Sequence, residues 1–211
     1  MKYCEEIQNK GYKIFIHPMH TGSYTDIELI DLLEQINKVN PFGFTIVDTT
    51  GSMTKNDINR LFKIIDSKLN LNIALAFHSH NNLNLSFENS IKLIQLCTNR
   101  DLIIDSTLYG IGRGAGNLKT ELIVKHLNNE YNLFELKKVI NELILPIYKK
   151  NPWGYSKIYE LSAKKFCHPN YATFLINKNF PDEFVNTVLN SIPLKKRLSY
   201  DEKIIKQLII N

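Results

Sequence analysis

The sequence predicts a parallel α/β fold followed by a helical region, and three observations lead to this prediction. Four short runs of apolar, β-favouring residues begin at residues 13, 43, 72 and 101, so they recur every 29 or 30 residues. An amphipathic segment with helical spacing follows each run. After residue 132 the β-favouring runs stop and helical patterns continue. We therefore expect strand–helix units over residues 1–131 and a C-terminal helical region over residues 132–211.

Each β-favouring run is apolar on both faces, which is typical of a strand buried on both sides in a parallel sheet. The predicted strands are residues 13–17, 43–48, 72–78 and 101–105, and the predicted helices are residues 25–38, 54–68, 84–97 and 118–131. Thr54 is the expected N-cap of the second helix. Such units build both doubly wound sheets and (β/α)8 barrels, and a complete barrel needs about 250 residues. The period alone therefore predicts either half a barrel or a small open sheet.

The C-terminal region is predicted to contain one long helix and several shorter ones. Residues 133–150 have the pattern of an amphipathic helix, and Pro152 marks its end. Pro169, Pro181 and Pro193 separate the shorter helices that follow.

Composition and charge narrow the class of protein. With 44% hydrophobic and 22% charged residues, the chain has the composition of a soluble globular protein. The net charge of +5 is small, and the short basic cluster at residues 195–197 has no interleaved aromatic residues, so no nucleic-acid partner is expected. Cys4, Cys97 and Cys167 form no CxxC pair, which favours a reducing compartment. Because no apolar run resembles a signal peptide or reaches the roughly 18 residues of a membrane helix, we expect a cytoplasmic protein without a membrane partner.

The strongest chemical signal is His78-Ser79-His80 at the end of the third predicted strand. In an extended strand, residues two positions apart face the same side, so both imidazoles are directed to one point. Two neutral imidazoles that converge suit a divalent metal ion, whereas the alternative is that one histidine packs and the other faces solvent. Ligands of α/β folds bind at the carboxyl ends of the strands. This position, followed by the amides of Asn81 and Asn82, favours a metal site.

Two carboxylates, Asp48 and Asp105, end the neighbouring predicted strands. Either one could be the third protein ligand that a catalytic metal requires. Either could instead orient an imidazole by accepting its ring N–H, or cap the following turn. The sequence leaves these roles open. His17 and His20, at the end of the first strand, are predicted to be structural or rim residues.

A glycine-rich segment, residues 110–117 (GIGRGAGN), follows the fourth strand and precedes a helix. Its GxGxGxG spacing differs from the GxGxxG of dinucleotide sites. The glycines offer free backbone amides to an anion near a helix start, and Arg113 could bind a carboxylate with two hydrogen bonds. A tight strand-to-helix turn is the alternative interpretation. Later in the chain, Trp153 and Tyr155 predict either packed aromatic residues or a tyrosine hydroxyl that acts as an acid or base.

Four segments carry a family resemblance: residues 47–51 (VDTTG), 78–83 (HSHNNL), 89–90 (NS) and 105–117 (DSTLYGIGRGAGN). Taken in order, they resemble the HMG-CoA lyase-like superfamily of metal-dependent (β/α)8 barrels, and most of all its 4-hydroxy-2-oxovalerate aldolase branch. In that branch the histidine segment ends strand 7 and the glycine segment ends strand 8. The four predicted strands are therefore similar to barrel strands 5 to 8. The resemblance is specific over about residues 10–120. It is weaker beyond, where Tyr155 and Tyr159 are similar to the GYxxxY segment of the aldolase branch.

The resemblance implies a divalent metal ion, manganese or magnesium, bound by His78 and His80. It also implies cleavage or formation of a carbon–carbon bond in a 2-oxo acid through a pyruvate-type enolate, whose charge the metal would stabilise. Tyr155, or else Tyr159, would be the catalytic tyrosine. We expect four further residues to bind the substrate: Asp48, Asn82, Asp105 and Gly114.

The chain departs from this family in one respect, because barrel strands 1 to 4 have no counterpart in it. The family's third metal ligand is an aspartate on strand 1. We therefore expect a truncated or split aldolase or lyase whose first half comes from a separate chain, a split gene or a misassigned start. The expected partner is a chain that carries strands 1 to 4, or a second copy in a homo-oligomer, and whether this chain is itself an enzyme stays open. One alternative is a non-catalytic remnant or interaction module, and another is a fragment of an isopropylmalate synthase-like acyltransferase. The cysteine-bearing loop of true HMG-CoA lyases is absent, so that activity is not expected.

Overall fold

The structure, a computed structural model, describes residues 2–96, 98–127 and 131–210. Contacts within it define two compact units. As far as their residues are described, the first consists of Met1–Asp48, Met53–Ser79 and Glu88–Asp105, and the second of Thr49–Ser52, His80–Phe87 and Ser106–Asn211. A domain boundary between residues 131 and 132 stays a prediction.

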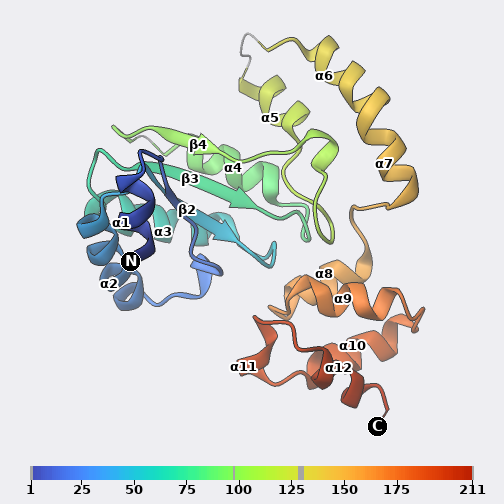
Figure 1. Cartoon of the computed structure of the whole chain (residues 1–211). Helices are drawn as coiled ribbons and strands as arrows, with labels where there is room; N and C mark the ends of the chain where they lie inside the picture. The colour runs from blue at the N-terminus through green and yellow to red at the C-terminus, as the bar shows by residue number, and fades with distance from the viewer. Residues whose placement is uncertain (1, 97, 128–130, 211) are drawn as a thin grey trace. The chain divides into compact units, whose positions relative to one another are not determined.

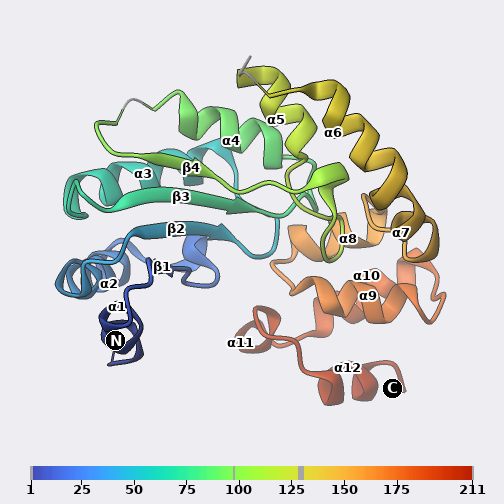
Figure 2. The same cartoon turned by 45° about the horizontal axis from the view of Figure 1, so that its top comes forward.

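The first unit contains a parallel four-stranded sheet, whose strands lie side by side in Figures 1 and 2. The strands are β1 (Phe15–Ile16), β2 (Gly43–Asp48), β3 (Ala74–Ser79) and β4 (Leu102–Ile104), which confirms the four predicted strands. Each strand pairs in parallel with its neighbour in sequence, in the order β1-β2-β3-β4. A doubly wound sheet reverses its strand order at a switch point, whereas the wall of a barrel does not. The fold is therefore a partial (β/α)8 barrel.

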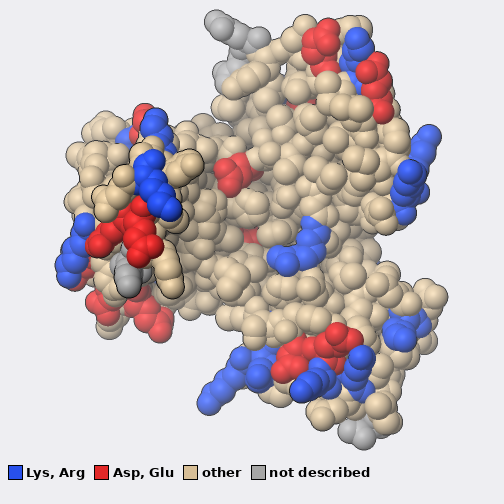
Figure 3. All heavy atoms as spheres, in the orientation of Figure 1, with Lys and Arg blue, Asp and Glu red and all other residues tan. Residues whose placement is uncertain are grey.

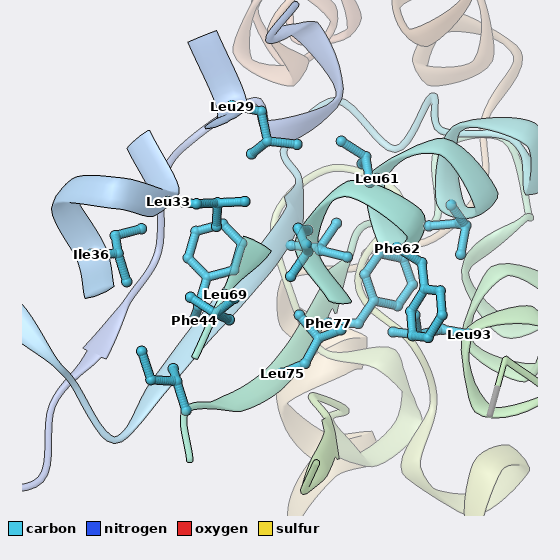
Figure 4. Close-up of a cluster of buried hydrophobic side chains, with 14 of the residues drawn as sticks. Leu29, Leu33, Ile36, Phe44, Leu61, Phe62, Leu69, Leu75, Phe77 and Leu93 are labelled. Carbon is cyan, nitrogen blue, oxygen red and sulfur yellow. The ribbon is translucent and has the colours of Figure 1, made fainter. Parts of the chain in front are cut away.

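Helices α2 (Asp26–Val39) and α3 (Lys55–Lys68) pack against one face of this sheet. Strand alternation directs Phe44 and Ile46 of β2, and Leu75 and Phe77 of β3, into this core, where all four are fully buried. Figure 4 shows their neighbours from the two helices, among them Leu29, Leu33, Ile36, Leu61 and Phe62. Each buried side chain of this size contributes roughly 1.5–3 kcal/mol. The core thereby fixes which residues of β2 and β3 face the opposite side of the sheet.

Local sequence signals set where these two helices begin. Thr25 and Glu28 form a capping box at the start of α2, and Thr54 and Asp57 form another at the start of α3. The predicted N-cap Thr54 is thus confirmed. The other helical segments of this part of the chain are α1 (Lys2–Asn9), η1 (Thr21–Ser23) and α4 (Ser86–Ile94). Cys97, which precedes the fourth strand in the sequence, lies outside the described residues.

Arg100 joins α3 to the start of β3 within the first unit. Its guanidinium is fully buried, and Nε lies 3.1 Å from Asp66 Oδ1. The other guanidinium N–H groups donate to the carbonyl oxygens of Asp66, Leu69, Asn70 and Ile73. A single side chain therefore satisfies the carbonyls at the end of α3 and in the following turn.

The second unit contains loops from the strand ends and a series of helices (Figures 1 and 2). Its elements are η2 (Leu108–Gly110), α5 (Thr120–Leu127), α6 (Leu133–Val139), η3 (Ile140–Ile144), α7 (Leu145–Lys150), α8 (Lys157–Lys164), α9 (Pro169–Ile176), α10 (Asp182–Ser191), α11 (Leu194–Arg197) and α12 (Glu202–Leu208). The predicted helix over residues 133–150 is observed, but η3 interrupts it as a π-helical turn. The turn lies directly before Pro146, which has no N–H for the regular helical hydrogen bond.

The last five helices have a hydrophobic core of their own. Eight buried residues form it: Cys167, Tyr171, Leu175, Val185, Val188, Leu189, Ile192 and Ile205. The Tyr171 hydroxyl lies 3.0 Å from the carbonyl oxygen of Lys196 and accepts a hydrogen bond from the N–H of Asp201. On the surface of these helices basic and acidic side chains are interleaved (lower part of Figure 3), and they form ion pairs such as Lys157–Asp182. No described helix is long and apolar enough to span a membrane.

Candidate functional site

His78 lies near the end of β3, on the sheet face opposite the helices. Because Leu75 and Phe77 point into the helix-covered core, the alternation of the strand directs His78 to the other side. The register of β3 and β4 pairs Phe77 with Ile104, so His78 lies beside Asp105. The His78 Nδ1 and Asp105 Oδ2 atoms are 3.2 Å apart, and both side chains are about one-third exposed. A carboxylate that accepts from Nδ1–H leaves Nε2 as the ring nitrogen with a lone pair.

The backbone at His80 is attached to the glycine-rich segment within the second unit. His80 forms an isolated antiparallel bridge with Asn117, and the Asn81 N–H donates to the carbonyl oxygen of Gly116 at 2.8 Å. The His80 residue itself is 8% exposed. The glycine segment therefore helps to fix the position of the second histidine.

Asp48, at the end of β2, accepts a hydrogen bond from the backbone of the turn that follows the strand, within the first unit. It is 3% exposed, and its Oδ2 accepts a hydrogen bond from the Met53 N–H at 3.1 Å. The buried Asn89 donates from Nδ2 to the Met53 carbonyl oxygen at 2.7 Å. Of the roles open to Asp48 in the sequence, this contact corresponds to the cap of the following turn.

Asn82 links three loop segments of the second unit. It is fully buried, and its Nδ2 donates to the carbonyl oxygen of Thr50 at 2.9 Å. Its Oδ1 accepts from the N–H of Ala115 at 3.2 Å. One amide thus connects the loop after β2, the histidine segment and the glycine segment, so Asn82 holds the loops in place with both ends of its side chain.

Three glycines of residues 110–117 adopt left-handed backbone conformations, with φ of 66° at Gly110, 65° at Gly114 and 83° at Gly116. A Cβ atom at Gly116 would lie 2.2 Å from the Gly110 carbonyl oxygen, so only glycine fits there. A Cβ atom at Gly114 would touch Asn82 Oδ1 at 3.4 Å. The glycine segment is therefore folded tightly on itself, as the strand-to-helix turn interpretation predicts, and the exposed Arg113 lies at its tip.

Tyr155 precedes α8 and is 52% exposed. Its hydroxyl donates a hydrogen bond to the Glu160 carboxylate, and this bond raises the pKa of the Tyr155 phenol. Tyr159 lies in α8, and its hydroxyl is 3.1 Å from Thr173 Oγ1. Of the two residues, Tyr155 is the more exposed.

The remaining histidines of the first predicted strand end have structural contacts. His17 Nε2 lies 3.2 Å from Thr45 Oγ1 within the first unit. His20 adopts a left-handed conformation with φ of 56° at the start of η1. Both positions agree with their predicted structural or rim role.

The chemistry of these donors indicates how well a divalent metal ion would fit. His78 has a carboxylate at Nδ1 that orients its ring, and a second imidazole follows two residues later. Within residues 2–96, 98–127 and 131–210, no group of three His, Cys, Asp or Glu side chains is arranged to hold a metal ion. The residues therefore fit a divalent ion as two of the three or more protein ligands that a catalytic site requires.

Sequence reasoning missed one feature near these loops, a cluster of aromatic rings from Tyr109, Tyr148 and Trp153. Their positions are up to 44 residues apart in sequence. Neither periodicity nor motif spacing relates such residues. The one signal available was the aromatic Trp153 next to the Gly154-Tyr155 segment.

Comparison with known proteins gives a consistent family. A family model described as HMGL-like matches residues 1–141, more than half of the chain. A 4-hydroxy-2-oxovalerate aldolase of Pseudoalteromonas translucida is 30% identical over 125 residues, which cover 56% of this chain and 36% of the relative. An oxaloacetate decarboxylase of Mycobacterium tuberculosis is 25% identical over 157 residues, which cover 74% of this chain and 45% of the relative. The chain thus spans less than half the length of these curated relatives.

A solved structure supports the fold. The crystal structure of the N-terminal domain of a Bacteroides vulgatus protein assigned as an aldolase superposes with a TM-score of 0.74 at 27% sequence identity. The superposition covers 84% of this chain and 58% of that one. The parallel strands and their helices therefore have the same arrangement as in that domain.

Proposed function

This chain belongs to the HMGL-like family, and from that premise we propose that it supplies half of the active site of a divalent-metal-dependent aldolase or lyase. The substrate class would be a 2-oxo acid, because the two curated relatives are named for 4-hydroxy-2-oxovalerate and oxaloacetate. The observation that carries the proposal is the hydrogen bond between His78 and Asp105 at the carboxyl end of the sheet.

In this proposal His78 and His80 would hold the metal ion, manganese or magnesium. Asp105 would act on it through His78, since a carboxylate on Nδ1 fixes the tautomer and increases the basicity of Nε2. A divalent ion at this place would polarise the oxygens of a 2-oxo acid and stabilise the negative charge that develops when the carbon–carbon bond breaks.

Other residues of the chain would bind substrate or transfer a proton. Tyr155 would be protonated at neutral pH, as any phenol with a pKa of about 10 is, and its hydrogen bond to Glu160 raises that pKa further. It would donate the proton from Oη. The backbone at Gly114 would approach a substrate carboxylate. Asn82 and Asp48 would contribute by holding the surrounding loops, given that Asn82 binds Thr50 and Ala115, and Asp48 binds Met53.

The remaining protein ligand would come from other residues, on a separate chain or on a second copy of this one. Among the described strands, β1 and β4 each pair with a single neighbour. A barrel closes such edges, and unpaired strand edges otherwise promote association. The edges of this sheet are thus where a complementary half would add its strands.

Binding of Mn²⁺, measured by isothermal titration calorimetry, tests the metal site. The wild-type chain should bind Mn²⁺ saturably, His78→Ala should abolish the binding, and His126→Ala, an exposed histidine of α5, should leave it unchanged. Unaltered binding in His78→Ala would overturn the proposed site.

Release of pyruvate from 4-hydroxy-2-oxovalerate, followed with a coupled dehydrogenase, tests the reaction. Turnover that requires both Mn²⁺ and His78 would support the lyase proposal. Metal binding without turnover, by the chain at any concentration, would instead exclude a second copy of this chain as the missing half, and would leave a separate chain or the non-catalytic alternative.

A further inference from the structure

We propose that the second unit contains an additional ligand site, for a small aromatic carboxylate. A cavity of about 190 Å³ lies among its loops and α7, and eleven residues line it. The proposed metal ligands His78 and His80 do not belong to the lining, and of the proposed active-site residues only Tyr155 does. For comparison, a cavity of roughly 150 Å³ accommodates benzene. A single six-membered ring with one or two small substituents is therefore the right size.

Aromatic rings form one wall of this pocket. The ring centroids are 5.3 Å apart for Tyr109 and Tyr148, and 5.0 Å apart for Tyr148 and Trp153, and both pairs meet edge to face. The indole Nε1 of Trp153 donates to the Tyr109 carbonyl oxygen at 3.0 Å. Because these contacts fix the rings before a ligand arrives, binding a flat ring against them would cost little ordering of side chains.

The local backbone explains how the rings come together. The π-helical turn η3 before Pro146 contacts η2, the turn that contains Tyr109, and leads directly into the helix that contains Tyr148. On the other side, the lack of a side chain at Gly116 leaves room for the indole, since a Cβ atom there would lie 3.2 Å from Trp153 Cδ1. The glycine segment thus shapes this pocket as well as the loop that contains His80.

The polar groups of the lining select the charge of the ligand. Among the described residues of the lining, Lys119 is the charged one and none is acidic. Its ammonium lies 5.1 Å from the centre of the Tyr109 ring, and in the part of the chain that the structure describes it forms no ion pair. Aromatic rings attract cations when no positive charge lies beside them. Here the positive charge of Lys119 would repel a cationic ligand. An anion is the complementary partner.

Polar side chains stand beside the rings of the pocket. Asn117 belongs to the lining, and its Nδ2 donates to the Ile111 carbonyl oxygen at 3.0 Å. Its Oδ1 is buried, so it lies out of reach of a ligand in the pocket. The asparagine and tyrosine residues of the lining nevertheless provide polar groups next to the aromatic wall. A hydroxy-substituted benzoate, which combines a ring, a negative charge and a small polar substituent, therefore suits the pocket.

Trp153 is the single tryptophan of the chain, so its fluorescence reports on this pocket alone. We would titrate 4-hydroxybenzoate into the chain in the presence of EDTA, with excitation that selects tryptophan. Wild-type protein should show a saturable change, and Lys119→Met should raise the Kd about tenfold or more. Lys125→Met, an exposed lysine of α5 outside the lining, should bind like wild type. Benzylamine, with the same ring and the opposite charge, should bind far more weakly.

Three results would overturn the proposal. They are the absence of a saturable change up to about 10 mM ligand in folded wild-type protein, equal affinity for benzylamine, and an unchanged Kd in Lys119→Met. Circular dichroism of each variant shows whether it is folded, and saturation-transfer NMR on the free ligand provides a second measurement that needs no fluorescence. Since metal is absent from these titrations, their outcome is independent of the metal-dependent activity proposed above.

Discussion

Replacement of Asn82 tests whether this side chain holds the loops around the candidate site. Asn82 is fully buried and connects the Thr50 carbonyl oxygen, at 2.9 Å, to the Ala115 N–H, at 3.2 Å. Asn82→Ala removes both partners at once. Each buried group left without a hydrogen bond costs about 1–3 kcal/mol, so the free energy of unfolding should fall by roughly 2–6 kcal/mol.

Asn82→Asp distinguishes a lost donor from a lost side chain. The new carboxylate could still accept a hydrogen bond from the Ala115 N–H. Its other oxygen, however, would face the Thr50 carbonyl oxygen, and two acceptors repel each other. At pH 7 this substitution should therefore destabilise the protein at least as much as Asn82→Ala. Burial and the facing carbonyl would raise the pKa of the introduced carboxyl in the folded state. Its protonated form, which can donate to Thr50, would therefore prevail at lower pH. The deficit of this variant should shrink as pH falls from 7 to 5 and grow as pH rises through the raised pKa.

Urea unfolding followed by circular dichroism at pH 7 and pH 5 measures both effects. Asn72→Ala is the control, because Asn72 is exposed and its Nδ2 donates to another exposed side chain, that of Asn40. This control should stay within about 0.5 kcal/mol of wild type. A loss below about 0.5 kcal/mol in Asn82→Ala, or an Asn82→Asp variant as stable as wild type at pH 7, would refute the loop-holding role.

Three further predictions concern other named contacts. Asp105→Asn should weaken Mn²⁺ binding roughly 10–100-fold in calorimetry, while the exposed Asp101→Asn binds as wild type does; equal affinities would contradict the orienting role. Arg100→Met should lower the free energy of unfolding by about 3–5 kcal/mol in urea, because the Asp66 carboxylate and four carbonyl oxygens lose the buried guanidinium that donates to them; a loss under about 1 kcal/mol would contradict this. Burial raises the pKa of the Cys167 thiol to about 11 from about 9, so its contribution to stability is complete below pH 9 and is lost as pH rises to 11. The fall in unfolding free energy over this window should be shallower in Cys167→Ala, and identical slopes would disprove it.

The sheet could be predicted from the sequence because its strands and helices recur with one period. The central strands are observed at Gly43–Asp48 and Ala74–Ser79, close to the predicted residues 43–48 and 72–78. The outer strands are shorter than predicted, at Phe15–Ile16 and Leu102–Ile104, since each has one neighbour to supply hydrogen bonds. The strand order, which distinguishes a barrel wall from an open sheet, depends on pairing between segments and is not encoded in the period.

The individual roles in the candidate site depended on information that no local pattern contains. Asp48 and Asp105 were equivalent in sequence, as carboxylates at strand ends. They differ because packing decides which alternate residues of each strand face the helices. Phe44 and Ile46 face the helices, and Asp48 is an even number of residues from both, so it belongs to the same side. His78 and Asp105 lie together on the other face. The aromatic pocket was invisible for a similar reason, since its rings come from separate turns that meet only after the chain has folded.

Orientation of the histidines, which the structure shows, is separable from the catalysis proposed for this chain. In a barrel, a residue at a strand end is oriented by the neighbouring strand and by the loops that follow. For His78 that neighbour is β4, which brings Asp105 to its ring, and for His80 it is the glycine segment that pairs with its backbone. Both supports lie within this chain, so the proposed metal binding would depend on contacts that are already present. The proposed turnover would depend in addition on a third ligand, and for this reason an inactive but metal-binding chain would leave the assignment of His78 and Asp105 intact.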